Sequence, residues 1–128
     1  MTFNGKSEEA MNFYASVLPN TTITRLERYG NSPHVTAGNE NLVMHGAIKI
    51  GNEQIIFLDM DKAYAAPEFN WAISIMINCD TEAEFDAFFG ALENSGGNVM
   101  MGPASVGQVR KCAWVADKFG VTWQPVWA

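Results

Sequence analysis

Two segments of the chain carry large apolar residues at the spacing of an amphipathic helix. Residues 7–18 and 81–93 each place such residues three or four positions apart, so that they share one helical face. These residues are Met11, Tyr14 and Leu18 in the first segment, and Phe85, Phe88, Phe89 and Leu92 in the second. Thr81 with Glu84 fits a capping box, in which a hydroxyl and a carboxylate satisfy free backbone amides of the first turn. Ser7 gives a weaker start signal, with acidic residues after it.

Most other segments alternate apolar and polar residues or form short apolar runs, as strands do. The predicted strands are residues 1–4, 21–30, 42–50 and 53–60 in the first half, and 70–78, 98–102, 108–116 and 121–126 in the second. The pair Gly51-Asn52 is typical of a two-residue hairpin loop. Residues 117–120 predict a turn before the last strand.

The predicted order is strand–helix–strand–strand–strand, and it occurs twice. At an offset of 74 residues the two helices align, with Met11 opposite Phe85. Either half alone would leave one face of its sheet bare, whereas two halves can bury these faces. We therefore expect an α+β domain over residues 1–128, built from two modules at about 1–62 and 68–128. A ferredoxin-like sandwich is the alternative, but the extra strands after each helix argue against it.

The composition is that of an ordinary globular protein, with 48% hydrophobic and 17% charged residues in a chain of 128. The formal net charge is −6 and no basic cluster occurs, so a phosphate backbone would be repelled and nucleic acid is not an expected partner. Cys79 and Cys112 lack CxxC spacing, which favours two reduced thiols. No apolar run is long enough to cross a bilayer, and no membrane partner is expected. We expect a soluble, cytoplasmic protein.

Several stretches, spread over nearly the whole chain, resemble one known superfamily. They are "SEEAMNFY", "LPNTTI", "VMHG", "GNEQIIFLD", "NCDTEAEFDAFF" and "CAWVADKFGVTWQPV", in the order in which that superfamily has them. The chain is similar to the vicinal oxygen chelate proteins, which include glyoxalases, extradiol dioxygenases and bleomycin- and fosfomycin-resistance proteins. The resemblance is closer to the PhnB-like branch labelled 3-demethylubiquinone-9 3-methyltransferase. It implies two curled mixed sheets around a small-molecule pocket, and a homodimer.

The resemblance also implies where a metal would bind, because metal-dependent relatives take one ligand from each of the first, fourth, fifth and eighth strands. Here the short first strand has neither His nor carboxylate, and the other positions correspond to Asp59, Asn70 and Gln124. A neutral amide is a poor ligand because it brings no charge to offset the dehydration of the cation. Asp59 could supply a carboxylate or could be a solvated strand-end residue. We therefore expect no cofactor and no tightly held metal; a divalent ion, if bound, would use Asp59 and Gln124.

His45 is the remaining candidate for a catalytic role. Strand alternation predicts that it shares a face with Val43, Ala47 and Lys49. An imidazole in this place could act as a general base or bind a ligand, or it could be a partly buried residue hydrogen-bonded across the sheet.

Aromatic residues complete the predicted pocket. Its members are His45, Phe57, Asp59, Asn70, Trp114, Trp123 and Gln124. The aromatic members could equally belong to the core, and Trp114 and Trp123 could lie across from one another in the last hairpin. In this interpretation Gln124 keeps the pocket polar without holding a metal.

Three functions fit these observations. The first is a binding protein of the bleomycin-resistance type, which holds an apolar or aromatic small molecule without chemistry. The second is an enzyme of the same superfamily that uses His45, Asp59 and Gln124, with or without a metal. The third is the methyltransferase of the family label, although the chain lacks the Gly-x-Gly-x-x-Gly turn after a strand that a typical adenosylmethionine-binding fold supplies.

Overall fold

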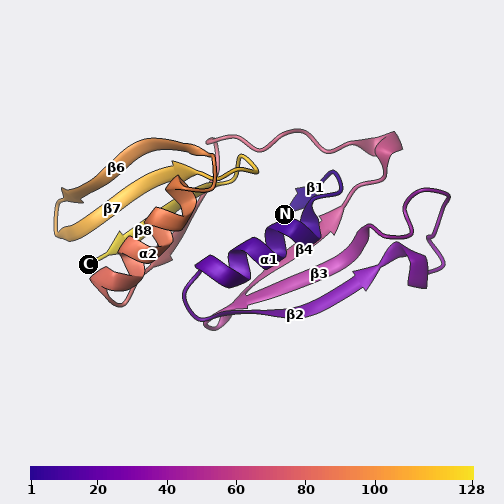
Figure 1. The fold of residues 1–128 in the computed structure, drawn as a ribbon, viewed down its shortest axis with the longest axis horizontal. Helices are drawn as coiled ribbons and strands as arrows, with labels where there is room; N and C mark the ends of the chain where they lie inside the picture. Colours follow the sequence, from indigo (N-terminus) through magenta and orange to yellow (C-terminus); the bar gives the residue numbers. More distant parts are fainter. The chain divides into compact units, whose positions relative to one another are not determined.

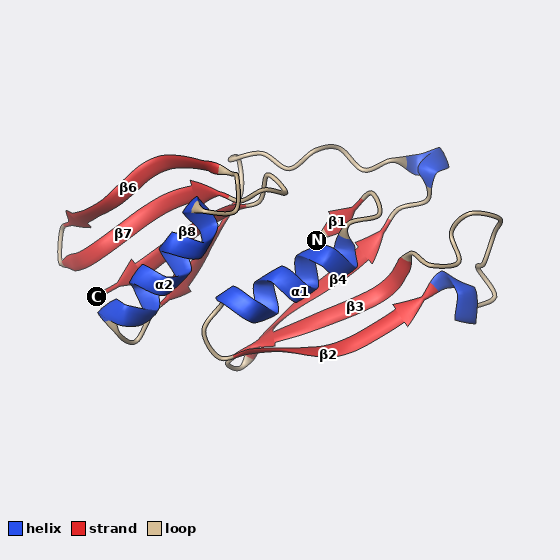
Figure 2. Cartoon of the chain, in the orientation of Figure 1, coloured by secondary structure: helices blue, strands red, loops and turns tan.

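The computed structural model describes residues 1–128 and divides them into two compact units, residues 1–67 and 68–128 (Figure 1). Each unit has one four-stranded sheet and one long helix (Figure 2). In each, the chain runs strand–helix–strand–strand–strand, which confirms the predicted α+β architecture and its repetition.

The first unit has a mixed sheet. Its elements are β1 (Thr2–Phe3), α1 (Ser7–Val17), β2 (Thr21–Arg28), β3 (Val43–Ile50) and β4 (Glu53–Asp59), with short 3-10 helices at Tyr29–Asn31 and Lys62–Tyr64. The strand order is β1-β4-β3-β2, with β1 parallel to β4 and the other neighbours antiparallel. Gly51 has a positive φ of 56°, which the first residue of a tight hairpin loop requires, and the pair Ile50↔Glu53 confirms the predicted two-residue connection.

The second unit repeats this topology. Its elements are β5 (Ser74–Asn78), α2 (Glu82–Glu93), β6 (Asn98–Val106), β7 (Val109–Ala116) and β8 (Thr122–Trp127). The strand order is β5-β8-β7-β6, with β5 parallel to β8. The predicted turn at residues 117–120 is present, and the amide of Gly120 donates to the carbonyl oxygen of Asp117 at 3.0 Å.

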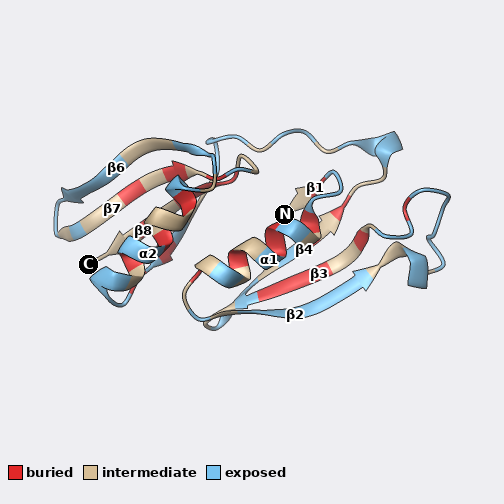
Figure 3. Cartoon of the chain, in the orientation of Figure 1, coloured by how far each residue is buried: buried red, intermediate tan, exposed pale blue.

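Each helix packs its apolar side on one face of its own sheet, and the buried residues gather on the helices and the central strands (Figure 3). In the first unit the ring of Tyr14 lies 6.0 Å from that of Phe57. In the second, Phe88 meets Trp123 edge to face at 5.8 Å. Burial of one such side chain contributes about 1.5–3 kcal/mol. Within each unit, the opposite face of the sheet has no helix on it.

The two helices begin where the sequence predicts, but by different means. The hydroxyl of Thr81 accepts from the amide of Glu84 at 3.1 Å, which confirms the first half of the predicted capping box. The Glu84 carboxylate accepts from the amide of Asp80, one residue before the N-cap, instead of from that of Thr81. At α1 the Ser7 hydroxyl is buried without a hydrogen-bond partner. There the cap is the carboxylate of Asp59, which accepts from the amide of Ser7 at 3.0 Å.

Candidate functional site

The strands of the second unit send alternate side chains to the two faces of its sheet. On β7 and β8, Val115 and Trp123 are fully buried and Trp123 packs against the helix residue Phe88. Their chain neighbours Trp114 and Gln124 are only partly buried and therefore lie on the helix-free face. These two residues of the predicted pocket thus share a face, and Trp123 does not share it.

Strand pairing lines up four side chains across this helix-free face. Met76 on β5 pairs with Gln124, and Met101 on β6 pairs with Trp114. The β7–β8 register runs from Val115↔Trp123 to Cys112↔Val126, which places Trp114 opposite Gln124. The sequence predicted a different arrangement, with Trp114 across from Trp123; this was wrong by one residue of register. The resulting row is Met76, Gln124, Trp114 and Met101.

The row beside the first begins with two hydroxyl side chains. Ser74 on β5 pairs with Thr122 on β8. The side-chain amide of Gln124 donates to the hydroxyl oxygen of Ser74 at 2.5 Å, which fixes the orientation of the carboxamide. The hydroxyl of Thr122 is buried and has no hydrogen-bond partner. We call the first row, together with these two hydroxyl residues, the Gln124 platform: Ser74, Met76, Met101, Trp114, Thr122 and Gln124.

The sequence interpretation missed four members of this platform, Ser74, Met76, Met101 and Thr122. A signal was present, since alternation along "SIMIN" places Ser74 and Met76 on one face. It was hidden because the fifth strand was predicted to begin at Asn70, whereas β5 begins at Ser74. Asn70 is exposed and its side chain accepts from the amide of Ala72, so it belongs to the preceding turn.

In the first unit, His45 lies on the helix-free face within a cluster of charged residues. It pairs with Glu27, and Arg25 pairs with Ala47. Arg25 donates twice to one carboxylate oxygen of Glu27, at 3.0 and 2.8 Å, and its Nη1 lies 3.5 Å from His45 Nε2. At 3.5 Å this contact lies beyond the usual hydrogen-bond range, and it places the imidazole beside the ion pair of Arg25 and Glu27.

The prediction that His45 shares a face of the sheet with Ala47 was correct. The prediction that Val43 lies on the same face was wrong. A register irregularity follows the pair Glu27↔His45, and Val43 then pairs with Arg28. The Cγ1 of Val43 lies 3.3 Å from the position that a Cβ on Gly46 would take, beside the side chain of Met11 on α1. Val43 therefore faces the helix, because the irregularity breaks strict alternation.

Asp59 was expected to be either a metal ligand or a solvated residue, and the structure shows that it is not solvated. The side chain is 2% exposed. One oxygen accepts from the amides of Gly5 and Ser7 at 2.9 and 3.0 Å, and the other accepts from the amide of Val43 at 2.9 Å. Three backbone amides thus donate to the carboxylate. Asp59 could bind a metal only if it gave up these bonds and with them the cap of α1.

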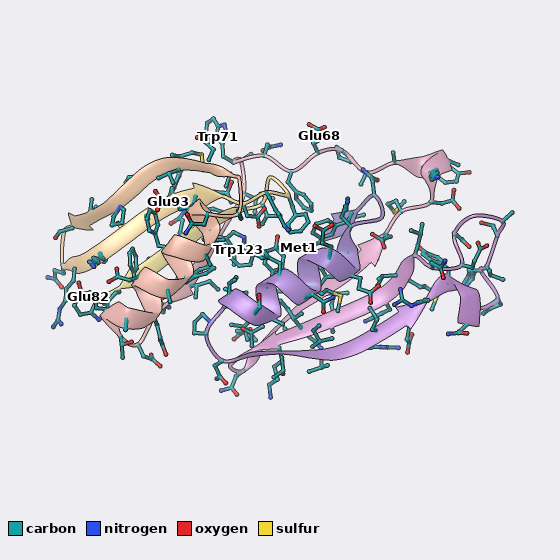
Figure 4. All side chains as sticks on the ribbon, in the orientation of Figure 1. Met1, Glu68, Trp71, Glu82, Glu93 and Trp123 are labelled. Carbon is teal, nitrogen blue, oxygen red and sulfur yellow. The ribbon has the colours of Figure 1, made fainter.

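The other aromatic members of the predicted pocket pack inside their units. Phe57 is fully buried between Phe3 and Tyr14. Trp123 is fully buried, and its indole nitrogen donates to the carboxylate of Asp117 at 2.9 Å. By contrast, Trp71, which precedes β5, is 68% exposed and points away from the sheet (Figure 4).

Two kinds of feature are absent from residues 1–128. No group of three or more His, Cys, Asp and Glu side chains lies close enough together to hold a metal ion. No helix is long and apolar enough to span a membrane.

The repeated strand–helix–three-strand unit defines a class of protein. A glyoxalase/bleomycin resistance protein from Albidiferax ferrireducens T118 is 14% identical and has the same fold, with a TM-score of 0.65 over 99% of this chain and 94% of that one. The fold is that of the glyoxalase/bleomycin-resistance proteins, in the vicinal oxygen chelate superfamily.

The chain can also be assigned to a family within this class. Residues 1–126 match the family model described as 3-demethylubiquinone-9 3-methyltransferase, and the chain belongs to this family. It is 31% identical to a PhnB protein from Bacillus cereus that carries the same methyltransferase name, over 100% of this chain and 95% of that one, with a TM-score of 0.81. It is 28% identical to protein PA1353 from Pseudomonas aeruginosa, over 99% and 92% of the two chains, with a TM-score of 0.88. A comparison with curated proteins finds no match.

Proposed function

We propose that this protein binds a small molecule and does so without a tightly held metal. The observation that carries the proposal is the Gln124 carboxamide, which Ser74 orients within a row of Met76, Trp114 and Met101. Apolar surface with a few oriented polar groups is the usual make-up of a small-molecule site. The carboxamide thus stands among apolar side chains on the helix-free face of its sheet.

Asp59 and Gln124, the two side chains that a metal would use, support the proposed absence of a tightly held metal. Asp59 gives both oxygens to backbone amides, and its side chain lies on the helix-covered side of its sheet. Gln124 is neutral and bonded to Ser74, so it offers a cation no charge.

Elemental analysis tests the absence of a metal directly. Protein purified without chelators is measured before and after incubation with nickel, zinc, manganese and iron(II). We expect no metal above background. One metal ion per chain that disappears in Gln124→Ala or Asp59→Ala would overturn the proposal and make the protein a chelate-type enzyme.

A second candidate function is an enzyme that uses His45. The observation that favours it is position: His45 pairs with Glu27, its Nε2 lies 3.5 Å from Arg25 Nη1, and an imidazole can act as a general base. The test is turnover of a ligand found by a thermal-shift screen, compared between the parent protein and His45→Ala.

The methyltransferase name of the family is a third hypothesis. Calorimetry with adenosylmethionine tests it, and we expect no heat of binding because no glycine-rich turn follows a strand in this chain. We also expect a homodimer, which light scattering coupled to size exclusion would detect as twice the mass of the chain.

A further inference from the structure

The charges on the Gln124 platform limit what it can bind. None of its six residues is ionisable at neutral pH, and the next row across the same face, from Asn78 through Val126 to Cys112, carries no charged side chain either. An ionic group placed on this surface would lose part of its hydration without gaining a counter-charge. The platform therefore favours an uncharged ligand.

The row of Met76, Gln124, Trp114 and Met101 also favours a particular shape of ligand. Trp114 presents an aromatic surface, and Met76 and Met101 stand at the two ends of the row with flexible, polarisable thioethers. Met76 is 60% exposed, so its side chain is accessible and adaptable. Methionine sulfur and indole rings both make favourable contacts with flat aromatic groups.

The polar atoms set a hydrogen-bonding pattern. The carboxamide of Gln124 uses one hydrogen on Ser74, which leaves its oxygen as an acceptor. The hydroxyl of Ser74 accepts that bond and keeps its own hydrogen to donate. The neighbouring hydroxyl of Thr122 is buried and out of reach of a ligand on this surface. A ligand carbonyl would accept from the Ser74 hydroxyl, while an adjacent N–H or O–H would donate to the Gln124 oxygen.

From this complementarity we propose that the Gln124 platform binds an uncharged, planar aromatic molecule that carries a hydrogen-bond donor beside an acceptor, as in an aromatic carboxamide. The inference rests on the proposed function and adds to it a ligand class and a location within the second unit. In this proposal the Gln124 oxygen accepts from the donor of the ligand, and the Ser74 hydroxyl donates to the acceptor of the ligand.

The test uses 2-naphthamide and 2-naphthoate, which match in shape; the naphthoate carries a negative charge and lacks the N–H donor. Isotope-labelled protein is titrated with each, and resonances of the Gln124 side-chain amide and the Trp114 indole are followed by NMR. We expect 2-naphthamide to bind at least about tenfold more tightly than 2-naphthoate and to shift both resonances. Loss of one hydrogen bond in Gln124→Met should weaken 2-naphthamide binding about three- to tenfold.

Two further variants make the result interpretable. Gln54→Met is the matched control, since Gln54 is an exposed glutamine on β4 of the other unit, and it should bind like the parent protein. Ser74→Ala removes the hydroxyl by a smaller change, so it tests the same contact if Gln124→Met fails to fold.

Each other outcome has a distinct meaning. Equal or tighter binding of 2-naphthoate, or no loss in both Gln124→Met and Ser74→Ala, would overturn the inference while small-molecule binding stands. Shifts confined to residues around His45 would do the same. If neither probe binds, the ligand class is wrong, and the proposed function fails as well only if a broad thermal-shift screen also finds no ligand.

Discussion

At the scale of single residues, the buried carboxylate of Asp59 joins three parts of the first unit. It holds the amides of Gly5 and Ser7 at the start of α1 and the amide of Val43 at the start of β3. In Asp59→Asn one acceptor oxygen becomes an NH₂ group that faces an amide donor. We expect a loss of about 2–3 kcal/mol in the free energy of unfolding, because bonds to charged groups are worth about 1.5–3 kcal/mol.

Urea denaturation measures this loss, and Asp61→Asn is a matched control. Asp61 accepts from the amide of Ala63, at the start of a short 3-10 helix, and from the exposed hydroxyl of Thr36 at 3.3 Å. That substitution should cost less than about 1 kcal/mol. Equal losses in the two variants would contradict the role assigned to Asp59.

The role of Asp59 could not be predicted from the sequence. The amides that it binds come from Gly5 and Ser7, more than 50 positions away, and from Val43, 16 positions away. Local pattern shows only a carboxylate at the end of an apolar strand, which fits a solvated residue equally well. Gln124 was predictable as a polar residue among apolar ones, but its partner Ser74 depended on the β5–β8 register.

Cys79 gives a second prediction at this scale. Burial raises the pKa of its thiol to about 11, and the nearby charge of Glu84 adds to the rise. Because the thiolate is the reactive form, iodoacetamide should label Cys79 slowly at mildly alkaline pH and faster as the pH approaches 11. Mass spectrometry of a Cys112→Ser variant measures this rate without the other thiol.

The same shift in pKa has a consequence for stability. The unperturbed pKa of a cysteine thiol is 9.0, so above pH 9 the unfolded chain loses this proton before the folded protein does. Its contribution to stability is therefore complete below pH 9 and declines between about 9 and 11. Rapid labelling of Cys79 near pH 9 under native conditions would contradict the assignment.

At the scale of elements, the approach of β6 to the end of β7 depends on a glycine. A Cβ on Gly97 would overlap the backbone carbonyl of Ala116, which cannot move aside as a flexible side chain could. We expect Gly97→Ala to lower the free energy of unfolding by about 3 kcal/mol, at the upper end for overpacking. Thermal unfolding measures this loss. Gly102→Ala is the control within β6, because a Cβ there meets no atom within 4 Å, and it should change stability little.

Elements were more predictable from the sequence than their exact edges. The Thr81 side-chain cap of α2 and the hairpin at Gly51 depend on residues close in sequence, and both are present. The start of β5 was placed too early because Trp71 and Ile73 are apolar, although both are exposed. The orientation of Val43 was missed because a register irregularity in the β2–β3 pair leaves no mark on the sequence.

At the scale of the whole molecule, duplication has left two units with the same topology and different chemistry on their helix-free faces. The first carries Arg25, Glu27 and His45, and the second carries the uncharged Gln124 platform. A shared fold therefore does not imply a shared task for the two halves, and function has to be argued from each set of side chains. The family model spans both units and does not distinguish them.

This difference between the units yields a last prediction. A ligand that binds only the folded protein raises its melting temperature, by an amount set by its affinity. His45→Ala should leave the rise caused by 2-naphthamide unchanged, because His45 lies in the first unit, whereas Gln124→Met should reduce it. His34→Ala, in an exposed loop of the first unit, controls for the loss of an imidazole. A smaller rise in His45→Ala but not in His34→Ala would show that the ligand also depends on the first unit, and the assignment to the Gln124 platform alone would be wrong.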